Sequence, residues 1–164
     1  MNKYLFLGVF LLAFSLAEAQ YYDQSVGLRL GNTSGVTYKN FLTEREAMEI
    51  MVSGRNHGIQ LTGLYQVYKP LNLGDDFFLY YGGGAHVGSE RWPEPYDAYP
   101  PAPVNPELQH NEFVMGVDGI LGVEYRSRTP LTFGLDIKPY LQFVGFKYTH
   151  LEFWDVAVSV KFLL

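Results

Sequence analysis

The sequence contains no cysteine, so no disulfide bond supports the fold. It has only four histidines, and no two of them are spaced as a metal-binding pair, so we expect neither a metal nor another cofactor. Beyond residue 19 there is no apolar run of the ~18 residues that a membrane-spanning helix needs. The net charge is −5 and no polybasic tract is present, which disfavours a nucleic-acid partner.

The first nineteen residues predict a cleaved secretory signal peptide. Lys3 supplies a positive charge near the N-terminus, and the stretch from Tyr4 to Leu16 is almost wholly apolar. Ala17-Glu18-Ala19 then fits the A-x-A cleavage pattern. No cysteine follows the cleavage site, which excludes a lipoprotein anchor. We therefore expect residues 20–164 to form one exported domain, with an uncleaved helical anchor as the alternative.

The composition favours strands, because aromatic residues make up 16% of the chain and glycine is frequent. If this chain crosses a membrane without a helix, it must do so as a closed barrel. Eight segments alternate between an apolar face and a face of Gly, Ser, Thr and single charges, as in a narrow lumen, although alternation also marks any half-buried strand. These segments are Ser25–Gly31, Gly35–Phe41, Ala47–Ser53, Gly58–Tyr68, Phe77–Gly88, Met115–Tyr125, Leu131–Lys138 and Asp155–Leu164.

The segments predict an all-β fold, a closed antiparallel eight-stranded transmembrane β-barrel with an up-and-down meander. Two of them leave alternatives open. Thr43-Glu44-Arg45-Glu46 matches a capping box, so a short helix over Glu44–Met51 competes with the third strand. Pro139 cannot donate to a strand ladder and predicts a bulge or a strand end.

The connections are asymmetric. One end has only short turns, as in the periplasmic turns of such barrels, and the other has two long connections, Glu90–Val114 and Gly145–Trp154. The first of these holds six of the nine prolines together with Trp92, Tyr96 and Tyr99. Proline lowers the ordering cost of binding and aromatic rings supply contact area, so this loop is a candidate interaction surface. A stiff protective cap is the alternative.

Four stretches carry a resemblance to a known family: Gly27-Leu28-Arg29-Leu30-Gly31, Tyr81 to His86, Gly119 to Tyr125, and Asp136-Ile137-Lys138-Pro139. In this order they resemble the small eight-stranded outer-membrane barrels of the OmpX and OmpA-transmembrane type, in a branch with short hairpins. The resemblance implies a monomer in the outer membrane of a Gram-negative-type bacterium, surrounded by outer-membrane lipid and inserted by the barrel-assembly machinery. The last strand resembles the segment that this machinery recognises, except that the chain ends in Leu164 where the family usually has Phe or Trp.

An eight-stranded barrel has an interior that side chains just fill, so a wide pore is not expected. A catalytic or proton-conducting network is one interpretation of the charges on the lumen face, and an ion-pair core that neutralises itself is the favoured one. These charges are Arg29, Lys39, Glu49, Asp118, Glu124, Asp136, Lys138, Asp155 and Lys161.

The main rival function is an enzyme that modifies lipid A by acyl transfer or deacylation, which would need a histidine close to a serine. His57 with Ser53 and His150 with Ser159 are the only nearby pairs, and neither carries a family motif. The outward tyrosines, such as Tyr38, Tyr65, Tyr81 and Tyr125, are typical of an aromatic girdle. The sequence thus predicts a non-enzymatic integral outer-membrane protein with an envelope-structural or surface-interaction role. The alternatives are a lipid A-modifying enzyme and a small-solute channel.

Overall fold

The structure is a computed structural model that describes residues 24–72, 74, 76–93, 109–145 and 148–164. The predicted signal peptide and its cleavage site lie outside the described residues, as do Tyr96 and Tyr99 of the candidate interaction loop. No helix in the described part of the chain is long and apolar enough to cross a membrane.

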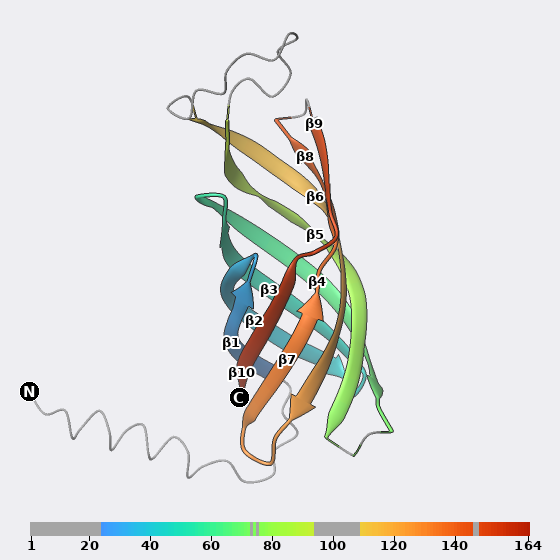
Figure 1. Ribbon diagram of the computed structural model, residues 1–164. Coiled ribbons are helices and arrows are strands. Elements are labelled where there is room, and N and C mark those ends of the chain that lie inside the picture. Colours follow the sequence, from blue (N-terminus) through green and yellow to red (C-terminus); the bar gives the residue numbers. More distant parts are fainter. Residues whose placement is uncertain (1–23, 73, 75, 94–108, 146–147) are drawn as a thin grey trace, which may run out of the picture.

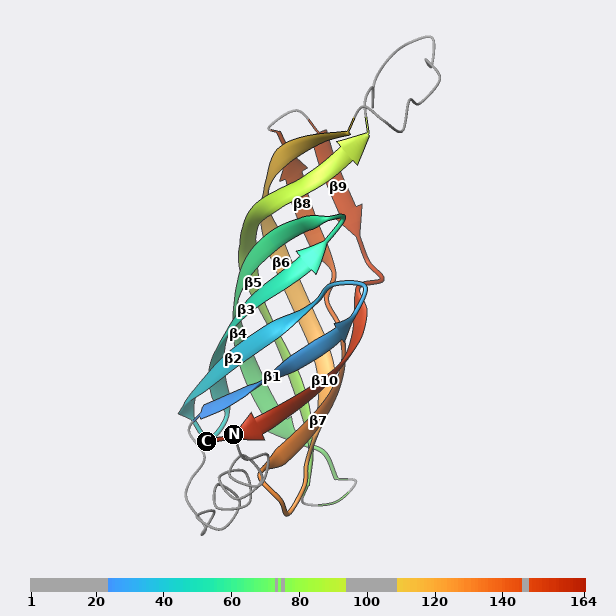
Figure 2. The ribbon, with the colours of Figure 1, turned by 90° about the vertical axis from the view of Figure 1, so that its left-hand side faces the viewer.

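The described chain forms one antiparallel sheet that closes on itself (Figures 1 and 2). Closure comes from the pairing of the first and last strands, in which Ser25 lies opposite Leu163 and Gly31 opposite Ala157. The ten strand segments are β1 (Gln24–Gly31), β2 (Ser34–Thr43), β3 (Glu46–Arg55), β4 (Gly58–Pro70), β5 (Phe77–Pro93), β6 (Gln109–Arg126), β7 (Leu131–Ile137), β8 (Tyr140–Val144), β9 (Tyr148–Glu152) and β10 (Val156–Leu163).

Two of the barrel's strands are interrupted, which is why ten segments make an eight-stranded barrel. Segment β8 continues β7 along β6, and β9 leads into β10. The predicted fold class, a closed eight-stranded antiparallel meander, is confirmed. We call the end at which the chain terminates the terminal end, and the opposite end, where β5, β6, β8 and β9 rise highest, the distal end (Figure 1).

The two faces of the barrel are inverted relative to a soluble protein. Large apolar side chains such as Leu28, Ile50 and Val158 are exposed on the outside, whereas their neighbours Arg29, Glu49 and Ser159 are buried in the lumen. Because side chains alternate along a strand, one register places most of the large apolar side chains outward and the polar ones in the lumen; Met51, Leu64 and Val114 are buried exceptions.

The competing helix over Glu44–Met51 is wrong, because Glu44 and Arg45 form a turn and the residues from Glu46 onward belong to β3. Strand β3 pairs with β4 along its whole length and with β2 from Glu46 to Gly54, and these ladders override the local helix signal. The capping residue Thr43 does accept a hydrogen bond, from the backbone nitrogen of Arg45 at 3.3 Å, but within the tight turn that joins β2 to β3.

Both long connections are shorter than predicted, which corrects their boundaries. Strand β5 continues to Pro93 and β6 begins at Gln109, with Trp92 opposite His110, so the hairpin extends well into the predicted Glu90–Val114 loop. The predicted connection Gly145–Trp154 contains β9, which pairs with β8. The strands were predicted at the length that spans a bilayer, so strand residues beyond that length were assigned to the connections.

Pro139 lies at the break between β7 and β8, and the bulge predicted for it lies in the facing strand. Strands β7 and β8 pair with β6 in one continuous register. On their other side, β7 pairs with β10 and β8 pairs with β9, and these two registers differ by one residue. The extra residue places Phe153 and Trp154 next to each other on the outside, 56% and 72% exposed. Because proline has no N–H, it can only accept in this ladder, and it does so from Gly119 at 2.8 Å.

Candidate functional site in the barrel lumen

The terminal half of the lumen contains a dense cluster of ion pairs centred on Glu49. Lys161 approaches one carboxylate oxygen of Glu49 at 2.5 Å, and Lys39 lies 3.5 Å from the other. Thr37 and Gln66 donate to the same carboxylate at 2.5 and 2.7 Å. Each oxygen of this buried carboxylate therefore lies beside a cation and accepts from a neutral donor, which is the condition under which a buried charge is tolerated.

A second carboxylate extends this cluster. Glu124 lies 3.2 Å from Lys39 and 3.0 Å from Arg126. The Lys39 ammonium also donates to the hydroxyl of Tyr68. Strands β2, β3, β6 and β10 are thus tied together across the interior rather than only through their neighbours.

Arg29 is the centre of a second cluster nearer the distal end. Its guanidinium contacts Asp136 at 2.7 Å and Asp155 at 3.2 Å, and it also donates to the backbone oxygen of Thr33 at 2.7 Å. Lys138 lies 2.9 Å from Asp118 and 3.4 Å from Asp155. Two cations and three carboxylates therefore alternate along the wall formed by β1, β6 and β7 and the residues that join the broken strands.

The rings of Tyr68 and Tyr80 connect the two clusters. They stack with centroids 5.4 Å apart, and the Tyr80 hydroxyl donates to Asp136 at 3.2 Å. Gly122 makes room for Tyr80, because a Cβ at this position would lie 2.5 Å from the ring carbon Cζ. The lumen is filled at this level by side chains that contact each other from wall to wall.

All nine lumen charges singled out from the sequence are buried, and each is in one of the two clusters. They comprise four cations and five carboxylates, and Arg126, which sequence reasoning did not single out, supplies a fifth cation. The arrangement can hold strands together and exclude ions. It holds no group of three or more metal-ligating side chains among the residues that the structure describes.

His86 forms a separate feature beside the second cluster. Its Nδ1 lies 2.8 Å from Asp118, and because a carboxylate only accepts, this nitrogen carries the proton. Its Nε2 is buried without a hydrogen-bond partner, and the imidazole and the Tyr140 ring are perpendicular with their centroids 5.5 Å apart. An oriented histidine of this kind resembles the base of a nucleophile pair, but no serine or threonine hydroxyl is within hydrogen-bond distance of it in the described residues.

The two histidine–serine pairs considered from the sequence are not assembled into a site. Ser53 points into the lumen, whereas His57 is exposed in the turn after β3, with a φ of 56°. His150 lies on β9 close to Tyr140 and Glu152, and Ser159 lies on β10, beyond the bulge.

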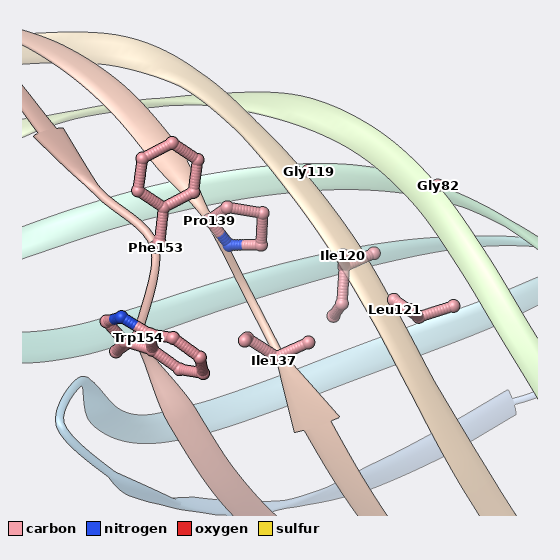
Figure 3. A pocket seen from close by; sticks show the side chains of 8 residues that line it. All are labelled: Gly82, Gly119, Ile120, Leu121, Ile137, Pro139, Phe153 and Trp154. Atoms are coloured by element: carbon pink, nitrogen blue, oxygen red, sulfur yellow. The ribbon is translucent and has the colours of Figure 1, made fainter.

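A hollow of about 500 Å³ lies on the outer face beside the broken strands (Figure 3). The hollow lies where glycines adjoin the exposed rings of Phe153 and Trp154. The Asn32 side chain donates to the Trp154 carbonyl at 2.6 Å. The lining residues are Gly82, Gly119, Ile120, Leu121, Ile137, Pro139, Phe153 and Trp154. The hollow is almost entirely apolar and offers no titratable group for chemistry.

No family model matches the sequence, and no curated protein matches it either. A solved structure similar to this chain is the N-terminal β-barrel domain of Pseudomonas aeruginosa OprF, with a TM-score of 0.61 and 12% sequence identity. The alignment covers 86% of this chain and 95% of that domain. The chain has the fold of that small barrel.

Sequence reasoning missed several lumen residues that complete the clusters. Tyr68, Gln66 and Tyr80 lie on the polar faces of their strands, so the same alternation that identified the charges could have found them. Glu90 was assigned to an external loop and is instead buried in β5. The backbone of Trp92 lies in β5 at the distal end, at the base of the candidate interaction loop.

Proposed function

We propose that this chain is a monomeric integral outer-membrane protein, exported through its N-terminal signal peptide and inserted by the barrel-assembly machinery. The observation that supports this most strongly is the inverted distribution of side chains. Exposed leucine, isoleucine and valine side chains cover the outside of the strands, while every cluster of charges faces the lumen. In water such a surface would aggregate, and in lipid it is the stable arrangement.

Within this proposal the barrel is a non-enzymatic anchor that does not conduct. The lumen is crossed by ion pairs and stacked rings from opposite walls, so ions have no continuous aqueous path. We place the role at the distal end, where β5, β6, β8 and β9 rise above the other strands (Figure 1). Trp92, Tyr96 and Tyr99 on this hairpin and its loop are the proposed contacts for a surface ligand or an envelope component.

The location is tested by expressing the full chain in a Gram-negative host and separating inner and outer membranes on a density gradient. The protein should be found in the outer-membrane fraction, shortened by about nineteen residues, as the A-x-A pattern predicts. It should migrate faster in an unboiled than in a boiled sample, since a folded barrel resists detergent. Recovery in the soluble periplasmic fraction would refute the proposal.

A further inference from the structure

Glu90 is the buried carboxylate with the most distant cation among the residues that the structure describes. Glu90 is 0% exposed, yet the nearest cationic nitrogen is the Nε of Arg55, 3.9 Å away. Every other buried carboxylate of the lumen has a cation within 3.2 Å, the closest being Lys161 on Glu49 at 2.5 Å and Arg29 on Asp136 at 2.7 Å. Since a buried charge is costly without a close counter-charge, Glu90 lacks the partner that the other carboxylates have.

The polar groups around Glu90 are also incompletely satisfied. Its Oε2 accepts only from the neutral amides of Asn56 at 3.1 Å and Gln142 at 3.3 Å, and its Oε1 accepts no hydrogen bond. The Oε1 of Gln142 and both side-chain polar atoms of Gln60 are likewise buried without partners. Gln60 lies opposite Gly88, one lumen-facing position below Glu90 on the β5 wall. Buried polar groups are normally hydrogen-bonded, so these oxygens are free to accept from a bound molecule.

The charge at this level is negative. Glu112 lies opposite Glu90 on β6, and Glu152 of β9 lies 3.9 Å from Arg55. Arg55 is the arginine that contacts this group among the described residues, its guanidinium lies 4.4 Å from the Tyr140 ring centroid, and the imidazole of His150 lies 3.9 Å from Glu152. Glu90 and Glu152 thus share one long-range guanidinium and Glu112 adds a third carboxylate, whereas elsewhere in the lumen positive and negative charges are nearly equal.

We propose that the distal lumen binds a small primary ammonium ion, with Glu90 as its counter-charge. An R–NH₃⁺ group has three N–H donors, and Glu90, Gln142 and Gln60 each present an oxygen without a hydrogen bond. Arg55 lies beside these groups, over the Tyr140 ring and 3.9 Å from both Glu90 and Glu152. This site goes beyond the anchoring role, because it lies within the barrel and does not involve the external loop.

The test is a titration of the full mature chain, folded in detergent micelles, with methylammonium chloride, followed by NMR of the backbone amides. Saturable shifts are expected in the upper parts of β5 and β8. Tetramethylammonium, which has no N–H donor, and potassium should bind at least tenfold more weakly at the same ionic strength. Equal binding of all three cations would mean non-specific charge attraction and would overturn the proposal, as would the absence of saturable shifts.

Variants separate the ammonium site from a simple Glu90–Arg55 ion pair. Glu90→Gln should weaken methylammonium binding at least tenfold, while the matched control Glu44→Gln, in an exposed turn at the terminal end, should leave it unchanged. Arg55→Gln should preserve or strengthen binding, because it removes a competing cation; loss of binding in this variant would contradict the proposal. If Glu90→Gln does not fold, Gln60→Leu serves in its place, because the Gln60 side chain makes no hydrogen bond that folding requires. It should weaken binding severalfold, and unchanged affinity would refute the site.

Discussion

Lys161 and Glu49 form an ion pair of 2.5 Å across the barrel lumen, although 112 residues separate them in the sequence. Lys161 is on the last strand and Glu49 on the third, with β1 and β2 between them in the sheet. The pair therefore bridges the strands on both sides of the seam at which the first and last strands meet. Closure of the barrel is reinforced through its interior as well as along its backbone ladder.

Removing one partner of this pair should destabilise the barrel strongly. Lys161→Met leaves Glu49 buried with only Lys39, at 3.5 Å, as a cation, and should lower the free energy of unfolding by about 3–5 kcal/mol. Urea unfolding in lipid vesicles, followed by tryptophan fluorescence, measures this change. Lys69→Met on an exposed position of β4 is the control and should change the free energy by less than about 0.5 kcal/mol. Similar values for the two variants would show that the lumen pair contributes nothing.

Two glycine substitutions distinguish the filled lumen from the open outer face. Gly122→Ala places a Cβ 2.5 Å from the Tyr80 ring and should cost about 1–3 kcal/mol, because Tyr80 would have to leave Asp136. Gly63→Ala on the outside of β4 meets no atom within 4 Å and should be tolerated. The same unfolding measurement compares them. If Gly122→Ala is as stable as Gly63→Ala, the lumen is less tightly filled than the structure shows.

The orientation of the barrel is tested at neighbouring positions of β10. Val158 is exposed on the outside and Ser159 faces the lumen. Val158→Arg should cost about 2–4 kcal/mol in lipid if the position lies near the bilayer midplane. In cysteine variants, a lipid-soluble thiol reagent should label position 158 and spare position 159. The reverse labelling pattern would mean that the faces are inverted.

The filled lumen predicts an electrically silent protein. Reconstituted in a planar bilayer, the wild-type barrel should show no large stable current, because ion pairs from opposite walls close the path. Stable opening steps whose ion selectivity changes in Asp118→Asn or Asp136→Asn would favour the channel alternative, since both carboxylates line the lumen.

The external loop should be dispensable for folding and necessary for surface binding. Pro93 and Gln109 are Cα partners at the end of the β5–β6 ladder, so residues 94–108 can be replaced by a two-residue glycine-containing turn. Heat-modifiable migration on a gel should survive, because the barrel closes through strands that this change leaves intact. Binding to whole cells or to envelope components should be lost with Tyr96 and Tyr99. A shortened protein that does not fold would assign the loop a structural role instead.

The sequence alone determined which side chains face inward. Alternation with period two is a local property of a strand, so Arg29, Glu49 and Asp136 could be placed in a lumen before any pairing was known. The same local pattern set the number of strands and the antiparallel meander. It could not decide between helix and strand at Glu44–Met51, because the capping signal is also local, and only the ladders with β2 and β4 decided this.

The tertiary structure alone decided which charges meet. Lys161 contacts Glu49 rather than Asp155 because strand register and barrel tilt fix the height of each side chain in the lumen, and neither can be read from one strand's pattern. The shift opposite Pro139, which places Phe153 and Trp154 together on the outside, likewise depends on a comparison of two neighbouring ladders. Glu90 was predicted to lie in a loop. It is buried in the lumen because β5 continues past the length that spans a bilayer.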